Sequence, residues 1–419
     1  MRILWLKTEL LHPVDKGGKI RTYQMLRAIN AKHPITYLTL DDGAAAPDAR
    51  ERALEYASAV ETVPFSVAPR GSLRFFAELA GNLLSPLAYS LARYEVAAFR
   101  ERVRAHLVAG DTDLVVCDFL TPWVNMPSDV SAFGVPVVLF QHNVEAEIWR
   151  RHAEVASNPV SRWYFGLQHA RMAHYERAAC RAADHVVAVS EHDARIFRER
   201  YGVTSVSDVP TGVDIQYFDP APFAARVPGR LVFTGSMDWM PNADGITWFT
   251  EQVWPRVRAA KPDATFTVVG RNPPAAVQAL ATPGSGIEVT GSVPDVRPYL
   301  GAGSAFVVPL RIGGGTRLKI YEAMAMECPI VSTTVGAEGL PVKHEEHLRL
   351  ADEAADFAAQ CVELLDRTEL AHAMAQRAAR YVRDNFGWDA VADHFVASCL
   401  AAAPAARSTT PVPEPQGLS

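Results

Sequence analysis

The chain has 419 residues, which is too long for a single hydrophobic core and predicts two domains. Hydrophobic residues make up 49% and charged residues 21%, the balance of an ordinary water-soluble globular protein. The net charge of -6 is spread along the chain without a basic block, which excludes nucleic acid as a partner. The 5 cysteines are scattered without a CxxC spacing, so no disulfide framework or structural zinc site is indicated and a reducing cytoplasm fits.

The amino-terminal apolar run at residues 1–6 is broken by Lys7 and Glu9. It is too short for a secretory signal and is typical of a first buried strand. No stretch reaches the roughly 18 apolar residues that are needed to span a bilayer. We therefore expect a cytoplasmic protein, with a peripheral contact at the inner face of the cytoplasmic membrane left open.

Short β-branched runs alternate with longer amphipathic runs along the whole chain. In the first half, the pattern predicts strands at 2–6, 35–40, 114–117, 135–140 and 185–189, with helices at 18–31, 89–107 and 164–182. In the second half it predicts strands at 230–235, 264–269, 287–290, 305–309 and 329–332, each followed by a helical stretch. This alternation predicts an α/β protein of two doubly wound, Rossmann-like domains that face each other across a cleft.

A stretch rich in Pro, Gly and Asp between the two series is the predicted linker. The last residues are rich in Pro, Ser and Thr without an apolar period, which is typical of disorder. Packing of the last helix against the first domain is left open. The predicted boundaries are 1–208 for an acceptor-side domain, 209–229 for the linker, 230–385 for a nucleotide-sugar domain, 386–403 for a final helix and 404–419 for a disordered tail.

Three consecutive glycines directly before a helical run form the most informative motif. The glycines let a ligand approach the backbone closely, and the helix start behind them offers free N–H groups and a dipole to an anion. Basic side chains add fixed charges there, and a carboxylate one turn later can accept from hydroxyls, so the run predicts a nucleotide-sugar site. A capped helix with solvated basic residues is the alternative. The residues are Gly313, Gly314, Gly315, Thr316, Arg317, Lys319 and Glu322.

Two loops of the first half also follow predicted strands. Gly17 and Gly18 open a helix after the first strand, where ligands approach the strand ends of a doubly wound domain, although two glycines are not a full GxGxxG. His142 follows the strand at 135–140 and is expected to face the cleft, where it could donate to a sugar or stabilise developing charge. A histidine that bonds to the backbone and shapes the loop is the alternative. Glu145 belongs either to the same site or to the start of a helix, where the helix dipole favours a negative charge.

Eight sequence pieces carry a resemblance to a known family. They are GGGTRLKIYEAMA at 313–325, DKGGKIR at 15–21, QHNVE at 141–145, VSE at 189–191, PTGVD at 210–214, FTGSMDW at 233–239, VGR at 269–271 and GSVPDV at 291–296. With the two doubly wound domains, they resemble the GT4-type retaining glycosyltransferases of the GT-B fold over nearly the whole chain up to the tail. The resemblance is closest to the branch that builds bacterial exopolysaccharide, including the sugar transferases associated with exosortase systems.

The resemblance implies a retaining, metal-independent hexosyltransferase without a cofactor. It would move a sugar from a nucleoside diphosphate sugar to a growing polysaccharide or a lipid-linked glycan, and the leaving phosphate would take the acceptor's proton. Backbone amides, Arg and Lys stabilise the charge that develops on the phosphate. The implied catalytic residues are His142, Arg317 and Lys319, and the implied donor-binding residues are Gly17, Gly18, Arg21, Asn143, Gly235, Arg271, Val293, Gly313, Gly314, Gly315, Thr316 and Glu322.

The chain also departs from the family pattern. Many members carry a Glu eight residues before the ribose-binding Glu, where this chain has Gly314. Many also carry an Arg after the glycine of the first strand of the second domain, and a Lys soon after, where this chain has Ser236 and Met237. We therefore expect Arg317 and Lys319 to replace that phosphate clamp. Asp111-Thr112-Asp113 spells DxD, but its place between a helix and a strand favours a turn over a metal site.

An apolar series with interleaved arginines runs from 72 to 107. It suits either a lipid-carrier or membrane-surface element, or an ordinary helical layer over the sheet, which we favour. Two other functions stay open for the whole chain. One is a nucleotide-sugar epimerase, and the other is a catalytically silent nucleotide-sugar-binding protein. The sequence identifies neither the sugar, the base, the acceptor nor the linkage.

Overall fold

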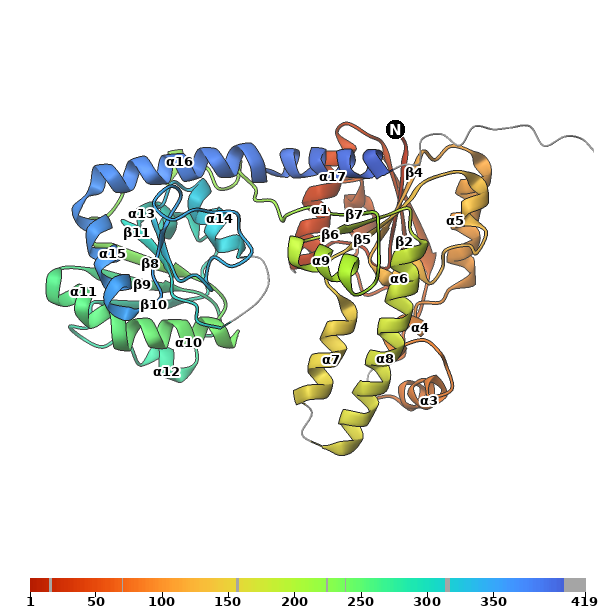
Figure 1. Ribbon diagram of the computed structural model, residues 1–419, viewed down its shortest axis with the longest axis horizontal. Coiled ribbons are helices and arrows are strands. Elements are labelled where there is room, and N and C mark those ends of the chain that lie inside the picture. The colour runs from red at the N-terminus through yellow and green to blue at the C-terminus, as the bar shows by residue number, and fades with distance from the viewer. Residues whose placement is uncertain are drawn as a thin grey trace, which may run out of the picture. The chain divides into compact units, whose positions relative to one another are not determined.

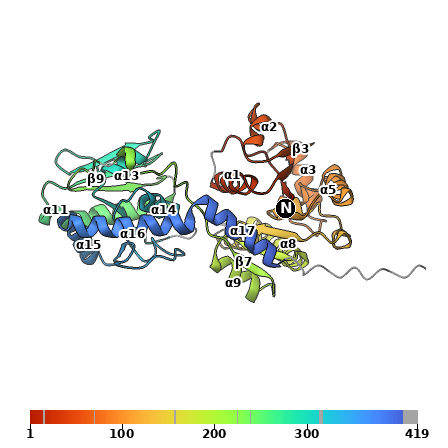
Figure 2. The same ribbon diagram turned by 90° about the horizontal axis from the view of Figure 1, so that it is seen from above.

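The computed structural model describes residues 1–14, 17–69, 71–155, 158–223, 225–237, 239–312 and 317–402. The chain divides into two compact units (Figures 1 and 2). Unit 1 comprises Met1–Val209 and the chain from Ala392 onward, and unit 2 comprises Pro210–Val391. Each unit is built around a parallel sheet, so the predicted α/β class with two doubly wound domains is confirmed.

The sheet of unit 1 has seven strands in the order β3-β2-β1-β4-β5-β6-β7. Its centre is β1, where Ile3 pairs with Ile35 of β2 and Leu114 of β4, all parallel. The polar β3 and the three-residue β7 lack a β-branched apolar run, which is why the sequence pattern missed them. The strands are β1 (Ile3–Lys7), β2 (Ile35–Asp41), β3 (Ala59–Pro64), β4 (Leu114–Asp118), β5 (Val137–Gln141), β6 (His185–Ala188) and β7 (Val206–Asp208).

Helices cover both faces of this sheet. On one face Phe99, Met172 and Phe197, from three different helices, pack on the strands. On the other face, Phe395 of the last helix lies against Trp5 and Phe140 with ring centroids 5.6 and 5.1 Å apart. The helices are α1 (Gly17–Asn30), α2 (Ala49–Arg52), α3 (Leu73–Asn82), α4 (Tyr89–Ala92), α5 (Ala97–Ala109), α6 (Leu120–Trp123), α7 (Glu145–Val155), α8 (Pro159–Ala182), α9 (Glu191–Glu199) and α17 (Trp388–Ala402).

Two expectations for residues 72–107 are wrong. The single helix expected at 89–107 is two helices, α4 and α5, separated by a turn at Arg93–Val96. The favoured layer over the sheet holds for α5, whose Phe99 and Val103 are buried, but not for α3, whose Leu73 is exposed. The reason is that α3 packs against α4 and α8 and, in Figure 1, lies below the body of unit 1 rather than on a face of the sheet.

The sheet of unit 2 has six strands in the order β10-β9-β8-β11-β12-β13. The strands are β8 (Arg230–Thr234), β9 (Thr265–Val269), β10 (Ile287–Gly291), β11 (Ala305–Val308), β12 (Ile330–Ser332) and β13 (Arg349–Leu350). The first five match the predicted strands within one or two residues. The sixth has only two residues, too few to leave a periodic signal.

Two apolar layers sandwich this second sheet. Val232 and Phe306 face Ile320 and Met324 on one side, while Phe233 and Phe266 face Phe249 and Phe357 on the other. The helices are α10 (Met240–Trp248), α11 (Trp254–Ala260), α12 (Ala275–Gln278), α13 (Arg297–Ala302), α14 (Leu318–Ala325), α15 (Ala354–Asp366) and α16 (Thr368–Phe386), with a π-helical turn at Phe249–Val253. Across the described ranges, no helix combines the length and apolar character needed to cross a membrane.

Candidate functional site

In each unit the candidate residues lie beside two neighbouring strands. From these two strands the strand order runs outward in opposite directions across the sheet. In unit 1 these neighbours are β1 and β4, and in unit 2 they are β8 and β11. Loops that leave the carboxyl ends of such neighbouring strands run to opposite faces, which opens a crevice that suits a ligand.

A buried carboxylate organises the candidate residues of unit 1. Asp118 ends β4 and is fully buried. Its Oδ2 lies 2.9 Å from Lys7 Nζ at the end of β1 and accepts hydrogen bonds from the Thr22 hydroxyl and the Trp5 indole, both at 3.1 Å. Its Oδ1 lies 2.8 Å from Nε2 of His142, which follows β5. The order β1-β4-β5 therefore brings Lys7, Asp118 and His142 together.

Burial and charge set the protonation of this cluster. Burial alone would raise the pKa of Asp118, but Lys7 and His142 act against it, and the net pKa lies well below the usual value. Burial lowers the pKa of His142 to about 4, although Asp118 opposes this shift. The imidazole is therefore neutral at pH 7. The 2.8 Å approach of Nε2 to the carboxylate favours the tautomer that carries its proton on Nε2, which leaves Nδ1 as a hydrogen-bond acceptor.

Two aromatic residues pack against the His142 ring, and one of them has a strained backbone. The ring lies between Phe119 and Phe140, with centroids 4.7 and 4.5 Å away. Phe119 has a φ of 89°, a left-handed conformation that costs energy for a bulky residue and that surrounding contacts must hold in place. The strained residue directly follows Asp118, so the strain lies next to the buried cluster.

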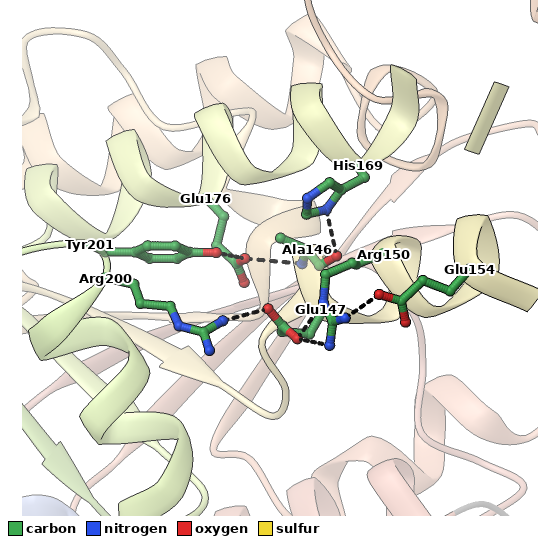
Figure 3. A network of polar contacts seen from close by, with 8 residues as sticks. All are labelled: Ala146, Glu147, Arg150, Glu154, His169, Glu176, Arg200 and Tyr201. Atoms are coloured by element: carbon green, nitrogen blue, oxygen red, sulfur yellow. Dashed lines mark hydrogen bonds and ion pairs between the residues drawn. The ribbon is translucent and has the colours of Figure 1, made fainter. Parts of the chain in front are cut away.

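A second buried carboxylate, Glu176, lies beside the loop that carries His142, and Figure 3 shows it between Ala146 and Tyr201. Glu176 of α8 accepts from the backbone N–H groups of Glu145 and Ala146 at 2.8 and 3.1 Å, and from the Tyr201 hydroxyl at 2.7 Å. It also accepts from the Gln141 side chain at 3.1 Å. These bonds pair free backbone N–H groups at the start of α7, after His142, and hold the Gln141 side chain at the end of β5, before His142. Burial raises the pKa of Glu176 to about 7, against the opposing effect of its donors.

The other residues predicted in unit 1 lie around the start of α1 and the loop after β5. Gly17 and Gly18 begin α1, and no atom lies within 4 Å of a Cβ added at Gly18. Arg21 is half-buried; burial lowers its pKa to about 10, while Asp118 and Asp193 act in the opposite direction. Asn143 is exposed beside His142, and burial raises the pKa of Glu145 while Asn143 acts against this shift. The motif residues Asp15 and Lys16 lie outside the described residues.

The candidate residues of unit 2 meet at the end of β8. Lys319, on the first turn of α14, places its ammonium where a Cβ on Gly235 would lie 2.6 Å away. The ammonium donates to the Asn242 side-chain oxygen at 2.9 Å and lies 4.2 Å from the centre of the Phe233 ring. Asn242 in turn donates to the Ser236 carbonyl at 2.7 Å. Only a residue without a side chain at 235 leaves room for this ammonium.

Arg317 and Glu322 lie on either side of Lys319. Arg317 is buried just before α14, with its guanidinium carbon 5.3 Å from the centre of the Trp239 ring, and burial lowers its pKa. Burial lowers the pKa of Lys319 to about 7 and raises that of Glu322 to about 7, while each group opposes the shift of the other. Arg317 lies near Trp239 and Lys319 lies near Phe233, so both cations approach the segment that follows β8, although they are only two residues apart in the sequence.

Arg271 and Val293 complete the described part of the predicted donor set. Arg271 follows β9 and donates to the Ser236 hydroxyl at 2.8 Å, so it borders the same segment. A Cβ on Gly270 would lie 1.8 Å from the Gly235 carbonyl oxygen, which explains the glycine before Arg271. Val293 is half-buried against the core on the α14 side of the sheet. Gly313, Gly314, Gly315 and Thr316, and the motif residue Asp238, lie outside the described residues.

The DxD sequence lies at the opposite end of its strand. Asp113 precedes β4 and accepts from the backbone N–H and the guanidinium of Arg2 at 2.7 and 2.9 Å. The candidate cluster lies at the other end of β4, where Asp118 stands. In the described part of the chain, no group of three or more His, Cys, Asp or Glu side chains is arranged to hold a metal ion.

Sequence reasoning missed Asp118, Lys7 and Asn242. Asp118 and Lys7 end apolar strands, and a charged residue at such a strand end is a signal that could have pointed to them. Asn242 belongs to the segment that follows β8, but nothing local distinguishes it from a helix-start residue. Its contact with Lys319 spans 77 positions and depends on the tertiary fold.

Two family models match successive parts of the chain. The model described as "Glycosyltransferase Family 4" matches residues 16–217, and the model described as "Glycosyl transferases group 1" matches residues 228–367. The chain is also similar to an uncharacterized 44.6 kDa protein in the cps region of Klebsiella pneumoniae, with 24% identity over 164 residues. That match covers 38% of this chain and 42% of the relative, less than half of either protein.

Solved structures share the fold over almost the full chain. A glycosyltransferase from Rickettsia africae has a TM-score of 0.62 at 13% identity, covering 96% of this chain and 99% of that one. The sucrose-phosphate synthase from Thermosynechococcus elongatus has a TM-score of 0.62 at 18% identity, covering 96% and 100%. HepE from Anabaena, in complex with UDP, has a TM-score of 0.63 at 14% identity, covering 96% and 100%. The chain therefore has the GT-B fold, and its first and second halves match a glycosyltransferase family 4 model and a glycosyl transferases group 1 model, respectively.

Proposed function

We propose that this protein is a retaining, metal-independent hexosyltransferase that moves a sugar from a nucleoside diphosphate sugar to a growing polysaccharide or lipid-linked glycan. The observation that carries the proposal is the Lys319 ammonium, which Asn242 holds at the carboxyl end of β8 against Gly235. The family pattern has basic residues soon after this glycine, and here a lysine from α14 brings its charge to the same place.

The diphosphate of the donor is the proposed ligand of Lys319 and Arg317. Transfer of the sugar leaves negative charge on the departing phosphate, and a fixed ammonium and guanidinium stabilise that charge without a metal ion. Their pKa values are lowered by burial, so a bound diphosphate restores a favourable environment for both cations. In the proposal the glycine run at 313–315 adds backbone amides, as expected from the sequence.

The nucleoside is the proposed ligand of Glu322 and of the segment around Arg271 and Val293. Glu322 lies on α14 one turn after Lys319, as a carboxylate that bridges ribose hydroxyls would. Solved complexes of the structurally similar HepE contain UDP and UDP-glucose. A UDP-hexose is therefore the first donor to test.

His142 is the proposed partner of the sugar in unit 1, together with Gly17, Gly18, Arg21 and Asn143. Its proton faces Asp118, so we infer that Nδ1 accepts a hydrogen bond from a sugar hydroxyl, rather than donating one. Asp118 is then a positioning residue, which keeps the imidazole neutral and correctly turned. The acceptor's proton goes to the leaving phosphate oxygen as the new glycosidic bond forms.

The proposed acceptor and location follow the resemblance to the exopolysaccharide branch. The similar protein of Klebsiella pneumoniae is described by its place in the cps region, which supports a role in polysaccharide assembly. Nucleoside diphosphate sugars are cytoplasmic metabolites, so the reaction belongs on the cytoplasmic side of the membrane. In this scheme residues 1–208 bind the acceptor and contact the donor's sugar, and residues 230–385 bind most of the donor.

The decisive experiment combines donor identification with product analysis. A panel of nucleotide sugars in a thermal-shift assay selects the donor, and release of nucleoside diphosphate with glycan acceptors then measures transfer. The anomeric configuration of the product, determined by NMR, tests retention. An epimer formed from the donor alone would support the epimerase instead. Nucleotide binding without diphosphate release under any acceptor would support a silent binding protein.

A further inference from the structure

Large apolar side chains are exposed at one end of unit 1. On α3 and the turn after it, Leu73 and Leu84 are 90% and 93% exposed, and Phe76 and Leu83 are also exposed. On the first turns of α8, Val160 and Trp163 are 74% and 60% exposed. We call the six residues Leu73, Phe76, Leu83, Leu84, Val160 and Trp163 the apolar tip.

The two halves of the apolar tip are fastened to each other. Arg171 of α8 donates to the carbonyls of Asn82 and Leu83 at 2.9 and 2.7 Å, and Gln168 donates to the Asn82 side chain at 3.3 Å. Phe75 packs edge-on against Tyr89, with centroids 5.9 Å apart. In Figure 1, α3 and the start of α8 both project below the body of unit 1. The tip is therefore a built surface and not a pair of loose segments.

Helix α3 has a covered side and an exposed side. Phe75, Leu79 and Asn82 recur at helical spacing and are half-buried or buried towards α4 and α8. The exposed side carries Leu73, Phe76, Ala77 and Ala80, with the ion pair of Arg74 and Glu78 on the same helix. Exposed leucine and phenylalanine side chains that gather in one place mark a surface that interacts with another apolar surface. The exposed side of α3 therefore suits an apolar environment outside this unit.

The charges around the tip differ in sign from the rest of the chain. Residues 72–95 and 158–175 contain four arginines and two glutamates, whereas the whole chain has a net charge of -6. Of the two glutamates, Glu78 is paired with Arg74 at 2.9 Å and accepts from the Tyr89 hydroxyl. Exposed leucines with Trp and Arg beside them are the composition of a helix that lies in the headgroup region of a bilayer.

We propose that the apolar tip docks unit 1 on the surface of an anionic phospholipid bilayer. Leucine and phenylalanine would enter the boundary between headgroups and acyl chains, Trp163 would lie at headgroup level, and arginines would contact the phosphates. A bilayer fits better than a protein groove, because the six side chains stand on separate projecting elements and the surroundings are basic. The docking does not depend on the proposed transfer reaction, although it would bring a lipid-linked acceptor to the acceptor-side unit.

Vesicle sedimentation of the full chain tests the proposal. The wild-type protein should bind vesicles of equal parts phosphatidylglycerol and phosphatidylcholine, and should bind pure phosphatidylcholine vesicles more weakly. The double variant Leu73→Glu/Leu84→Glu should partition at least about tenfold more weakly, because each leucine gives up the transfer free energy of a buried side chain. The matched controls Leu54→Glu and Val108→Glu alter residues of the same unit that are 59% and 67% exposed, and should bind like the wild type.

The outcomes separate docking from folding and from catalysis. All altered side chains are exposed, so circular dichroism melting should show unchanged folding. The double variant should transfer sugar to a water-soluble acceptor at the wild-type rate. If neither the wild type nor any variant transferred sugar, the proposed function would fail, while the vesicle binding would still test the docking. Absence of vesicle binding by the wild type would overturn the proposal. A dimer that forms without vesicles and is abolished by Leu84→Glu would also overturn it and assign the tip to a second copy of the chain.

Discussion

Replacement of Lys319 by methionine tests the phosphate site most directly. Methionine keeps an apolar stem over the Phe233 ring but removes the ammonium that donates to Asn242. Loss of one donor aimed at developing charge costs about 2.7–4 kcal/mol, a factor of about 10²–10³ in kcat. We expect Lys319→Met to lower kcat by this factor and to change nucleoside binding little.

A glycine substitution can displace the same ammonium without removing it. In Gly235→Ala the new Cβ would lie 2.6 Å from Lys319 Nζ and 2.8 Å from Asn242 Nδ2. Both atoms end flexible side chains and can move aside, whereas the φ of 159° at Gly235 strains the alanine backbone, so a melting curve must first show that the variant is folded. Gly235→Ala should therefore reduce kcat as Lys319→Met does, and the double variant should be no worse than either one, because both remove the same interaction.

The pH dependence gives an independent measure. Burial lowers the pKa of Lys319 to about 7, so the free protein loses this ammonium as the pH rises above that value. A diphosphate binds the charged form, and its affinity should weaken by up to about tenfold for each pH unit above 7, since one pKa unit is worth 1.36 kcal/mol. Titration calorimetry with the nucleoside diphosphate measures this slope. Lys319→Met should reduce it to the part that comes from Glu322, whose pKa burial raises to about 7.

The control is Lys343→Met, an exposed lysine of the same unit that pairs with Glu346. It should retain wild-type kcat and the wild-type pH slope. A folded Lys319→Met protein with wild-type kcat and an unchanged pH slope would refute the assignment of Lys319 to the leaving phosphate.

Three further predictions concern the nucleoside, the sugar and the metal. Glu322→Gln should weaken nucleoside diphosphate binding by about 1.5–3 kcal/mol, the range for hydrogen bonds to charged groups, and unchanged affinity in calorimetry would remove Glu322 from the site. His142→Ala should lower kcat with little effect on donor affinity. Because burial lowers the pKa of His142 to about 4, wild-type kcat should show no limb near pH 6.5 from this group. Normal turnover would make His142 a structural histidine. Excess EDTA should leave transfer intact, whereas loss restored by magnesium or manganese would return Asp111 and Asp113 to consideration.

Much of the fold could be predicted from sequence periodicity. Apolar runs such as 114–117 and 305–309 must be buried on both faces. Their alternation with amphipathic stretches predicts parallel sheets that are covered by helices on both faces. Periodicity fails to predict strands that are very short or that contain polar residues. For that reason β3, β7 and β13 went unpredicted, and the break between α4 and α5 has no proline or glycine to mark it.

The chain by itself determined the two doubly wound units and the residues that follow their strands, because these depend on local pattern. Only the tertiary structure decided which of those residues meet. The order β1-β4-β5 makes Lys7, Asp118 and His142 neighbours, and the pairing of β8 with β11 brings Lys319 to Gly235. Likewise, the sequence shows that α3 is apolar, but periodicity cannot state what covers an apolar face. Strand order and helix placement are non-local, because they follow from packing the whole chain, and so the site and the apolar tip became visible only in the folded molecule.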